Sequence, residues 1–293
     1  MRIVVTGASG LIGTRLVQAL RERGDDVTVL SRDPQRGVRW DPVAEPAPAE
    51  ALRGRDAVVH LAGEDVAQRW SAAARERIRS SRELGTRHLV AGLRALSAAE
   101  RPRTLVSGSA SGYYGPRGDE EVIEADPPGA GFLAEVCVAW EREAQAASEL
   151  GVRVVCLRTG IVLDRDGGAL AKMLPPFRLG VGGPIAGGRQ WMPWIHVDDE
   201  IGIILAALGD ERWAGAVNAS APVPVTNAQF SKALGRALHR PAVAPVPGLA
   251  IRALYGEMAS VVTTGVRMVP ARALELGHTF AHPELDGALR ATL

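Results

Sequence analysis

The first twenty residues constrain the fold of this chain more than any other stretch. Residues 3–5 form a short β-branched run, and a turn with three glycines follows. Apolar side chains then recur at helical spacing up to Leu20. This pattern is typical of a buried strand, a glycine-rich turn and an amphipathic helix. The first N–H groups of such a helix lack internal partners and carry partial positive charge, so they suit a pyrophosphate.

Each glycine of the turn is expected to have a different structural role. Gly7 permits a turn that a side chain would obstruct, Gly10 lets a ligand approach the backbone, and Gly13 lets the helix pack closely on the strand. The context therefore predicts a dinucleotide site, and the alternative is a plain tight turn. The cofactor-binding residues expected in this stretch are Gly7, Ser9, Gly10, Leu11, Ile12 and Gly13.

A second predicted strand, residues 26–30, ends at Ser31 and Arg32. An acidic residue at this place would bind the ribose of NAD. A guanidinium group instead forms charge-assisted bonds to a 2′-phosphate. The sequence therefore favours NADP(H) over NAD, with Ser31 and Arg32 among the cofactor-binding residues. The alternative is a solvated arginine beside Asp33.

The third predicted strand, residues 56–63, ends in small side chains that fit beneath a flat adenine or a pyrophosphate. A long helix is predicted over residues 72–95, with Ser71 as a plausible N-cap. Four residues at the strand end are expected to line the cofactor: Leu61, Ala62, Gly63 and Glu64.

A fourth strand begins at residue 104 and runs into a turn rich in serine, glycine and tyrosine. Hydroxyl groups at the carboxyl end of a parallel strand face the ligand crevice in this architecture. We therefore expect Ser107 to contact the cofactor. The candidate catalytic residues are Ser109, Tyr113 and Tyr114; the alternative is ordinary turn chemistry.

The remaining chain predicts further α/β units and then a helical lobe. A helix is expected over residues 132–150, and another begins near Asp198, which is predicted as its N-cap. His196 is either a hydrogen-bonded structural residue or a catalyst. Thr226 or Asn227 is expected to cap the first helix of the lobe. The predicted fold class is α/β, a doubly wound parallel (Rossmann) sheet, with residues 1–220 as the nucleotide-binding domain and 221–293 as a small, mostly helical lobe.

Composition narrows the class of protein. The 293 residues carry a formal charge of +1, which argues against a nucleic-acid partner. The two cysteines show no metal-binding spacing and no disulfide framework, so we expect no metal and a reducing compartment. No apolar run is long enough to cross a membrane. We expect a cytoplasmic protein with a small-molecule substrate and no membrane or nucleic-acid partner; no feature indicates an oligomeric state.

Several motifs, taken in order, resemble one family, the atypical short-chain dehydrogenase/reductases known as epimerase family proteins and often labelled nucleoside-diphosphate-sugar epimerases. The resemblance implies NADP(H) binding, with Ser31 and Arg32 at the adenosine phosphate, Leu61 and Ala62 along the cofactor, and Arg82 reaching it from the long helix. It also implies that the C-terminal lobe helps to cover a substrate pocket. The matching stretches are residues 6–13, 31–32, 61–64, 69–70, 80–82, 112–115, 194–198, 222–227 and 256–270.

The chain departs from the wider superfamily at its proton relay. Extended members carry Tyr-x-x-x-Lys at the start of the helix expected at residue 132. An alignment on Glu141 places Leu133 and Cys137 at those positions, and neither can relay a proton in that way. Other groups that could supply a proton are Ser109, Ser111, Tyr113, Tyr114 and Glu64.

Two functions are consistent with these features. The first is an NADP(H)-dependent oxidoreductase or epimerase that acts on a small carbonyl or sugar-nucleotide substrate. The second is a non-catalytic NADP(H)-binding protein that works through a partner, because the tyrosine–lysine pair is missing. The cofactor motifs support both, and the hydroxyl groups near the crevice favour the first.

Overall fold

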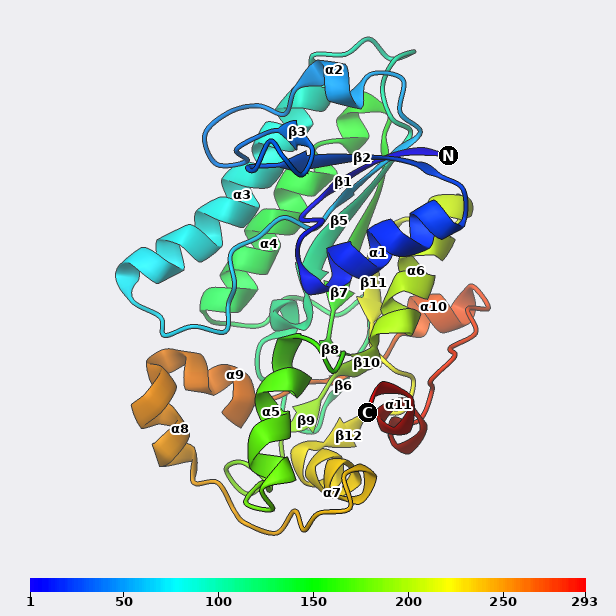
Figure 1. The fold of residues 1–293 in the computed structure, drawn as a ribbon. Coiled ribbons are helices and arrows are strands. Elements are labelled where there is room, and N and C mark those ends of the chain that lie inside the picture. The colour runs from blue at the N-terminus through cyan, green and yellow to red at the C-terminus, as the bar shows by residue number, and fades with distance from the viewer.

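A seven-stranded parallel sheet forms the centre of the computed structural model, which describes residues 1–293 (Figure 1). The strands lie in the order β11-β7-β5-β4-β1-β2-β3, and the order reverses at β1, which pairs with both β2 and β4. In such sheets ligands bind outside the carboxyl ends of the strands at the reversal point. The strands are β1 Arg2–Thr6, β2 Asp26–Ser31, β3 Val38–Arg39, β4 Ala57–His60, β5 Thr104–Ala110, β7 Arg153–Thr159 and β11 Gly215–Ala219.

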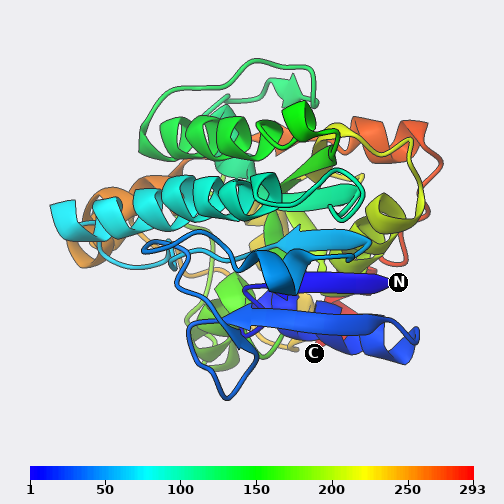
Figure 2. The same cartoon turned by 90° about the horizontal axis from the view of Figure 1, so that it is seen from above.

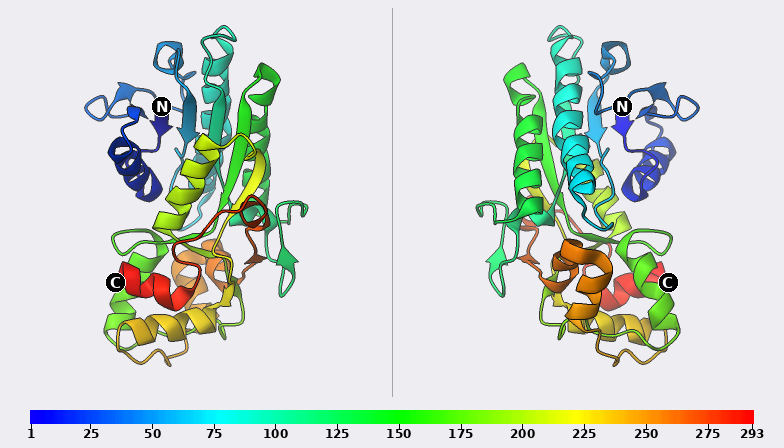
Figure 3. Two further views of the ribbon diagram at one scale, coloured as in Figure 1. Left: turned by 90° about the vertical axis from the view of Figure 1, so that its right-hand side faces the viewer. Right: turned by 90° about the vertical axis from the view of Figure 1, so that its left-hand side faces the viewer.

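Helices cover both faces of this sheet, as the views in Figures 2 and 3 show. One face carries α1 (Leu11–Glu22) and α6 (Val197–Gly209), and the other carries α2 (Ala49–Leu52), α3 (Ala72–Arg94) and α4 (Phe132–Gln145). Alternate strand residues supply the two apolar cores, as the strand period of two requires. The structure therefore confirms the predicted Rossmann-type α/β fold. No helix is both long and apolar enough to span a bilayer.

A smaller lobe lies beyond the carboxyl ends of the strands (Figure 1). Its apolar core unites Leu163, Leu174 and Trp194 with Phe230 and Leu289, so it draws on residues from both sides of position 220. Its elements are β8 Ile161–Leu163, α5 Gly168–Arg178, β9 Trp191–Met192, β10 Trp194–His196, β12 Val225–Thr226, α7 Asn227–Ala237, α8 Gly248–Tyr255, η3 Gly256–Met258, α9 Ala259–Thr263, β13 Arg267–Met268 and α11 Leu285–Thr292. The helix α10 Ala271–Glu275 packs on β11 of the main sheet. The remaining elements are η1 Ser111–Tyr114, β6 Glu121–Val122 and η2 Ser148–Leu150.

Helix ends differ from the sequence prediction in one instructive place. The N-cap of α6 is His196 and not Asp198: the His196 Nδ1 atom accepts a hydrogen bond from the Asp198 N–H at 3.1 Å. An imidazole that accepts through Nδ1 can cap a helix as a carboxylate would, although it is not among the residues usually favoured there. Of the two caps considered for α7, the structure selects Thr226, which forms a capping box with Gln229.

Candidate functional site

The turn between β1 and α1 packs tightly on the end of β4. Gly7 has a φ of +70°, and a Cβ added to it would lie 2.5 Å from the carbonyl carbon of Leu61. A Cβ on Gly13 would lie 2.2 Å from the Gly7 oxygen, so the helix start needs glycine there as well. Gly10 differs, since it is exposed and the nearest atom to an added Cβ is 3.3 Å away. Its outer face is therefore open to a ligand.

The buried side chains of Thr6 and His60 form a hydrogen-bonded pair next to this turn. The Thr6 hydroxyl accepts from the Ala62 N–H at 3.2 Å and lies 2.7 Å from the Nδ1 atom of His60. Burial lowers the pKa of His60 to about 4, so the ring is neutral at physiological pH. The pair joins the ends of β1 and β4, the two strands that flank the crevice.

Arg82 on α3 supports the loop that follows β4. Its Nη1 donates to the Glu64 carbonyl at 3.0 Å, and its guanidinium lies 5.1 Å from the centre of the Trp140 ring. A Cβ on Gly63 would approach the Arg82 Cζ to 3.2 Å. Burial lowers the pKa of Arg82, but an arginine remains charged. The structure thus brings Arg82, Gly63 and Glu64 together beside the glycine turn.

Arg32 lies exposed after β2 and forms no ion pair. Hydrogen bonds from Gln68 and Arg77 lower the pKa of Glu64, and the charge of Arg32 adds to this effect. The neighbouring Ser31 hydroxyl accepts from the Asp33 N–H at 3.1 Å. A cation without an acidic partner at this corner suits an anionic ligand group.

A buried polar network lies at the carboxyl end of β5. The Ser109 hydroxyl donates to Glu141 Oε1 at 2.6 Å, and Arg158 binds both oxygens of that carboxylate at 2.8 and 2.9 Å. Arg158 also donates to the Tyr114 hydroxyl at 2.9 Å, and this hydroxyl donates to Asn218 Oδ1 at 2.6 Å. The network therefore connects β5, α4, β7 and β11 near the carboxyl ends of these strands.

The two neighbouring tyrosines have different environments. Tyr114 is fully buried, and burial raises its pKa to about 12, although Arg158 opposes this shift. Tyr113 is half-buried, and its hydroxyl makes no hydrogen bond within the protein. The Arg158 guanidinium lies 3.4 Å from the centre of the Tyr113 ring. Of the two phenols, Tyr113 is the one free to reach a ligand.

Leu133 and Cys137 pack against the turn after β5. A Cβ added to Gly112 would lie 3.2 Å from the Leu133 Cβ and 3.9 Å from the Cys137 Sγ. Burial raises the pKa of the Cys137 thiol to about 12, so the thiolate is not populated at neutral pH. Leu133 and Cys137 therefore present an apolar surface to this turn and no group that could relay a proton at neutral pH.

The other residues expected at the site fall in two groups. Ser9 is exposed on the turn, while Leu11 and Ile12 are half-buried at the start of α1. Ser107 is fully buried, and its hydroxyl donates to the Gly108 carbonyl at 3.3 Å. The side chain of Ser107 is therefore shielded from solvent, and its contact with the cofactor stays a prediction.

Sequence reasoning missed the participation of Arg158 and Asn218 in the network. Both side chains are almost fully buried, at 3% and 0% exposed. Arg158 lies within β7, after a run of apolar residues, and a charged residue in such a buried position must find a partner. That signal predicts a buried ion pair, but it does not identify Glu141 as the partner.

The α8–η3–α9 segment approaches the crevice from the lobe. Arg69 Nη1 donates to the Ala253 carbonyl at 3.5 Å, and Arg75 forms an ion pair with Glu257. No residue of α8 is buried. Figure 1 shows α8 and α9 beside the N-terminal end of α3.

Comparisons with known proteins agree with this architecture. A model of the NAD dependent epimerase/dehydratase family matches residues 3–219, and a model of a domain of unknown function, DUF1731, matches residues 246–292. The Arabidopsis thaliana epimerase family protein SDR39U1 homolog, chloroplastic, is 41% identical over 100% of this chain and 87% of its own length. The human epimerase family protein SDR39U1 is 40% identical over 99% of both chains.

Two solved structures extend the similarity to three dimensions. The crystal structure of the human SDR39U1 protein with NADPH has a TM-score of 0.91 at 35% identity, over 100% of this chain and 99% of the other. A nucleoside-diphosphate sugar epimerase from Corynebacterium glutamicum has a TM-score of 0.80 at 34% identity, over 100% of this chain and 58% of that longer one.

Proposed function

This chain belongs to the NAD dependent epimerase/dehydratase family, and on that premise we propose that it is an NADP(H)-dependent oxidoreductase or epimerase. Its substrate is a small carbonyl compound or a sugar nucleotide. The observation that carries the proposal is the corner formed by the Gly7–Gly13 turn, the Gly63 loop and Arg32. It presents open backbone at a helix N-terminus and a free cation one strand away.

The corner has donors for the two phosphate-bearing parts of NADP(H). The Gly10 N–H donates to the Gly7 carbonyl at 3.0 Å, so the open donors that suit the pyrophosphate are the first N–H groups of α1, from Leu11 onward. Arg32 and Ser31 suit the 2′-phosphate, because arginine pairs with phosphate oxygens in a two-pronged geometry. The solved human relative was crystallised with NADPH, which supports the same ligand here.

NADP(H), when bound, supplies or accepts a hydride at the nicotinamide. The protein must then provide or remove a proton at the substrate oxygen. Tyr113 is our candidate for that proton, since its hydroxyl is unbonded and its ring lies beside the Arg158 cation. Ser109 and Tyr114 instead act through the network, in which Glu141 and Arg158 occupy their hydroxyls. They are positioning residues in this proposal.

The activity is tested by adding NADPH and a panel of aldehydes, ketones and sugar nucleotides to the purified protein. We expect at least one substrate to oxidise NADPH in a single turnover. Tyr113→Phe should slow that reaction by about 100-fold, the usual contribution of a proton donor, while NADPH affinity stays within twofold. If Tyr113→Phe reacts as fast as the wild type, the assignment of the proton donor is wrong.

The apolar surface of Leu133 and Cys137 favours a second candidate, a cofactor-binding protein without catalysis. Such a protein would bind NADPH yet leave it unreacted across the whole panel. A partner would then be retained on immobilised protein in NADPH but not in NADP. Oxidation of NADPH by any member of the panel would remove this alternative.

A further inference from the structure

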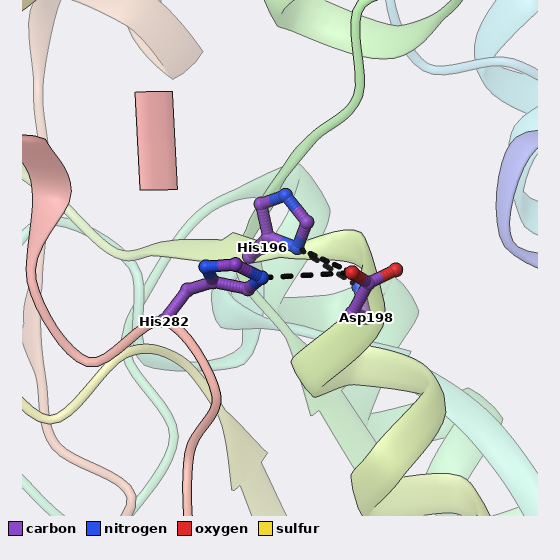
Figure 4. Close-up of side chains that lie close together, drawn as sticks. All are labelled: His196, Asp198 and His282. Atoms are coloured by element: carbon purple, nitrogen blue, oxygen red, sulfur yellow. Dashed lines mark hydrogen bonds and ion pairs between the residues drawn. The ribbon is translucent and has the colours of Figure 1, made fainter. Parts of the chain in front are cut away.

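Two histidines and one aspartate from separate parts of the chain converge at the N-terminus of α6 (Figure 4). His196 ends β10, Asp198 lies in the first turn of α6, and His282 lies just before α11. The Nδ1 atom of His196 and the Nε2 atom of His282 both lie 3.5 Å from the same oxygen, Asp198 Oδ2. The three potential ligand atoms all lie within 4.8 Å of one another.

The protonation state of His196 makes this arrangement unusual. Its Nδ1 accepts a hydrogen bond from the Asp198 N–H, so that nitrogen carries a lone pair and no proton. The Asp198 Oδ2 atom lies 3.5 Å from the same nitrogen, which is too far for a hydrogen bond between them. A metal ion bound at Nδ1 would therefore take the place of the Asp198 N–H as the partner of that lone pair.

The spacing fits a first-row divalent metal ion. Two imidazole nitrogens and a carboxylate oxygen form a familiar ligand set for zinc. With metal–ligand distances of about 2.0–2.1 Å and tetrahedral angles, ligand atoms lie about 3.3 Å apart. Two of the three separations here are 3.5 Å, close to that value. Coordination through His196 Nδ1 would also require this nitrogen to release the Asp198 N–H. The Asp198 side chain is 67% exposed, which leaves room for a water molecule as a further ligand.

Neighbouring groups hold the ligands in place. The Asp199 carboxylate accepts from the N–H groups of Ala281 at 2.6 Å and His282 at 3.0 Å, and so fixes the segment that carries His282. His196 is held by the pairing of β10 with β8. The positive end of α6 disfavours a cation, but the carboxylates of Asp198, Asp199 and Asp164 oppose that effect. Such outer support is typical of metal sites.

We propose that His196, Asp198 and His282 form a binding site for a divalent transition-metal ion of the zinc class. The ion would fasten the segment before α11 to β10 and to the start of α6. The sequence predicted no metal site, but that prediction was based only on the spacing of the cysteines. The proposal differs from it because it uses two histidines and an aspartate. It is independent of the proposed catalytic function, since no residue of the site belongs to the cofactor corner.

The test is a calorimetric titration of the chelator-treated full chain with ZnCl₂. We expect about one Zn²⁺ per chain, and a binding constant weakened at least about tenfold by Asp198→Asn and by His282→Asn. Asp198→Asn is the deciding variant, because the Asp198 side chain makes no hydrogen bond and its loss should leave the fold intact. Zn²⁺ should also raise the Tm of the wild type but not of Asp198→Asn.

His239→Asn is the matched control, because it removes an exposed histidine far along the chain from the site. Its backbone has a φ of 53°, which asparagine tolerates. This variant should bind Zn²⁺ as the wild type does. The proposal is overturned if the wild type takes up no Zn²⁺. It is equally overturned if Asp198→Asn binds Zn²⁺ as tightly as the wild type, since the metal would then sit elsewhere.

Discussion

The substitution Gly10→Ala separates binding from folding at the cofactor corner. Gly10 is the N-cap of α1, with φ −80° and ψ 172°, a conformation that alanine adopts readily. An added Cβ would meet only the Gly7 oxygen, at 3.3 Å. The methyl group therefore projects outward, into the space that we assign to the pyrophosphate of NADP(H).

The expected effect on stability is small. Alanine is a poorer N-cap than glycine, by about 0.5–1 kcal/mol. It also reduces the freedom of the unfolded chain, which returns about 0.4–1 kcal/mol. The two terms nearly cancel, so the Tm of Gly10→Ala should lie within about 3 °C of the wild type. Binding should fall much more, because each lost hydrogen bond to a charged group costs about 1.5–3 kcal/mol, or about 10- to 150-fold in Kd.

Fluorescence titration with NADPH and NADH, beside thermal unfolding, measures both quantities. Gly10→Ala should weaken both dinucleotides, since they share the pyrophosphate. Gly287→Ala is the matched control: its added Cβ meets nothing within 4 Å, and it lies on α11, so both dinucleotides should bind as in the wild type. Gly13→Ala should lose stability as well as binding, because its Cβ would lie 2.2 Å from a backbone oxygen. Wild-type NADPH affinity in a folded Gly10→Ala protein would refute the assignment.

Three further substitutions test other parts of the structure. Arg32→Ala should weaken NADPH about tenfold or more and leave NADH unchanged in the same titrations; equal losses for both would contradict a 2′-phosphate contact. Burial raises the pKa of Glu200 from 4.5 to about 8. The stability that the protonated carboxyl contributes is therefore full below its pKa in the unfolded chain, and it is lost as the pH rises from that value through the folded pKa of about 8. Between pH 6 and pH 9, the free energy of unfolding of Glu200→Gln, measured with urea, should therefore fall by roughly 1–3 kcal/mol less than that of the wild type. If both proteins lose the same stability over this range, Glu200 does not have this role. Tyr114→Phe should cost about 1–2 kcal/mol, because it leaves Asn218 without its donor, yet it should not shift the pH dependence of turnover; a shift would make Tyr114 the proton donor.

Local patterns were sufficient to predict the corner at the glycine turn. The strand, turn and helix of residues 2–22 are contiguous, so spacing alone indicates which glycines need freedom and which N–H groups remain open. The fold class followed from the alternation of such units. Arg82 was expected near the cofactor only through family resemblance, and the structure places it beside Gly63.

Long-range pairings could not be predicted in the same way. Arg158 and Glu141 come from different elements, and only the packing of α4 on β7 sets the geometry of their bidentate contact. The cap of α6 was assigned to Asp198 because carboxylates commonly occupy that position, whereas the start of the helix at Val197 makes His196 the cap. The approach of His282 depends on how the last segment docks, which no local pattern encodes.

The shared core of the small lobe limits how this protein can be divided. Leu285 and Leu289, in the region matched by DUF1731, pack in one cluster with Leu163 and Trp194, which belong to the region matched by the epimerase family. Residues 246–292 excised on their own would leave those leucines in water and forfeit the burial that orders α11. The boundary between the two family models is therefore a division of sequence and not of autonomous folding units.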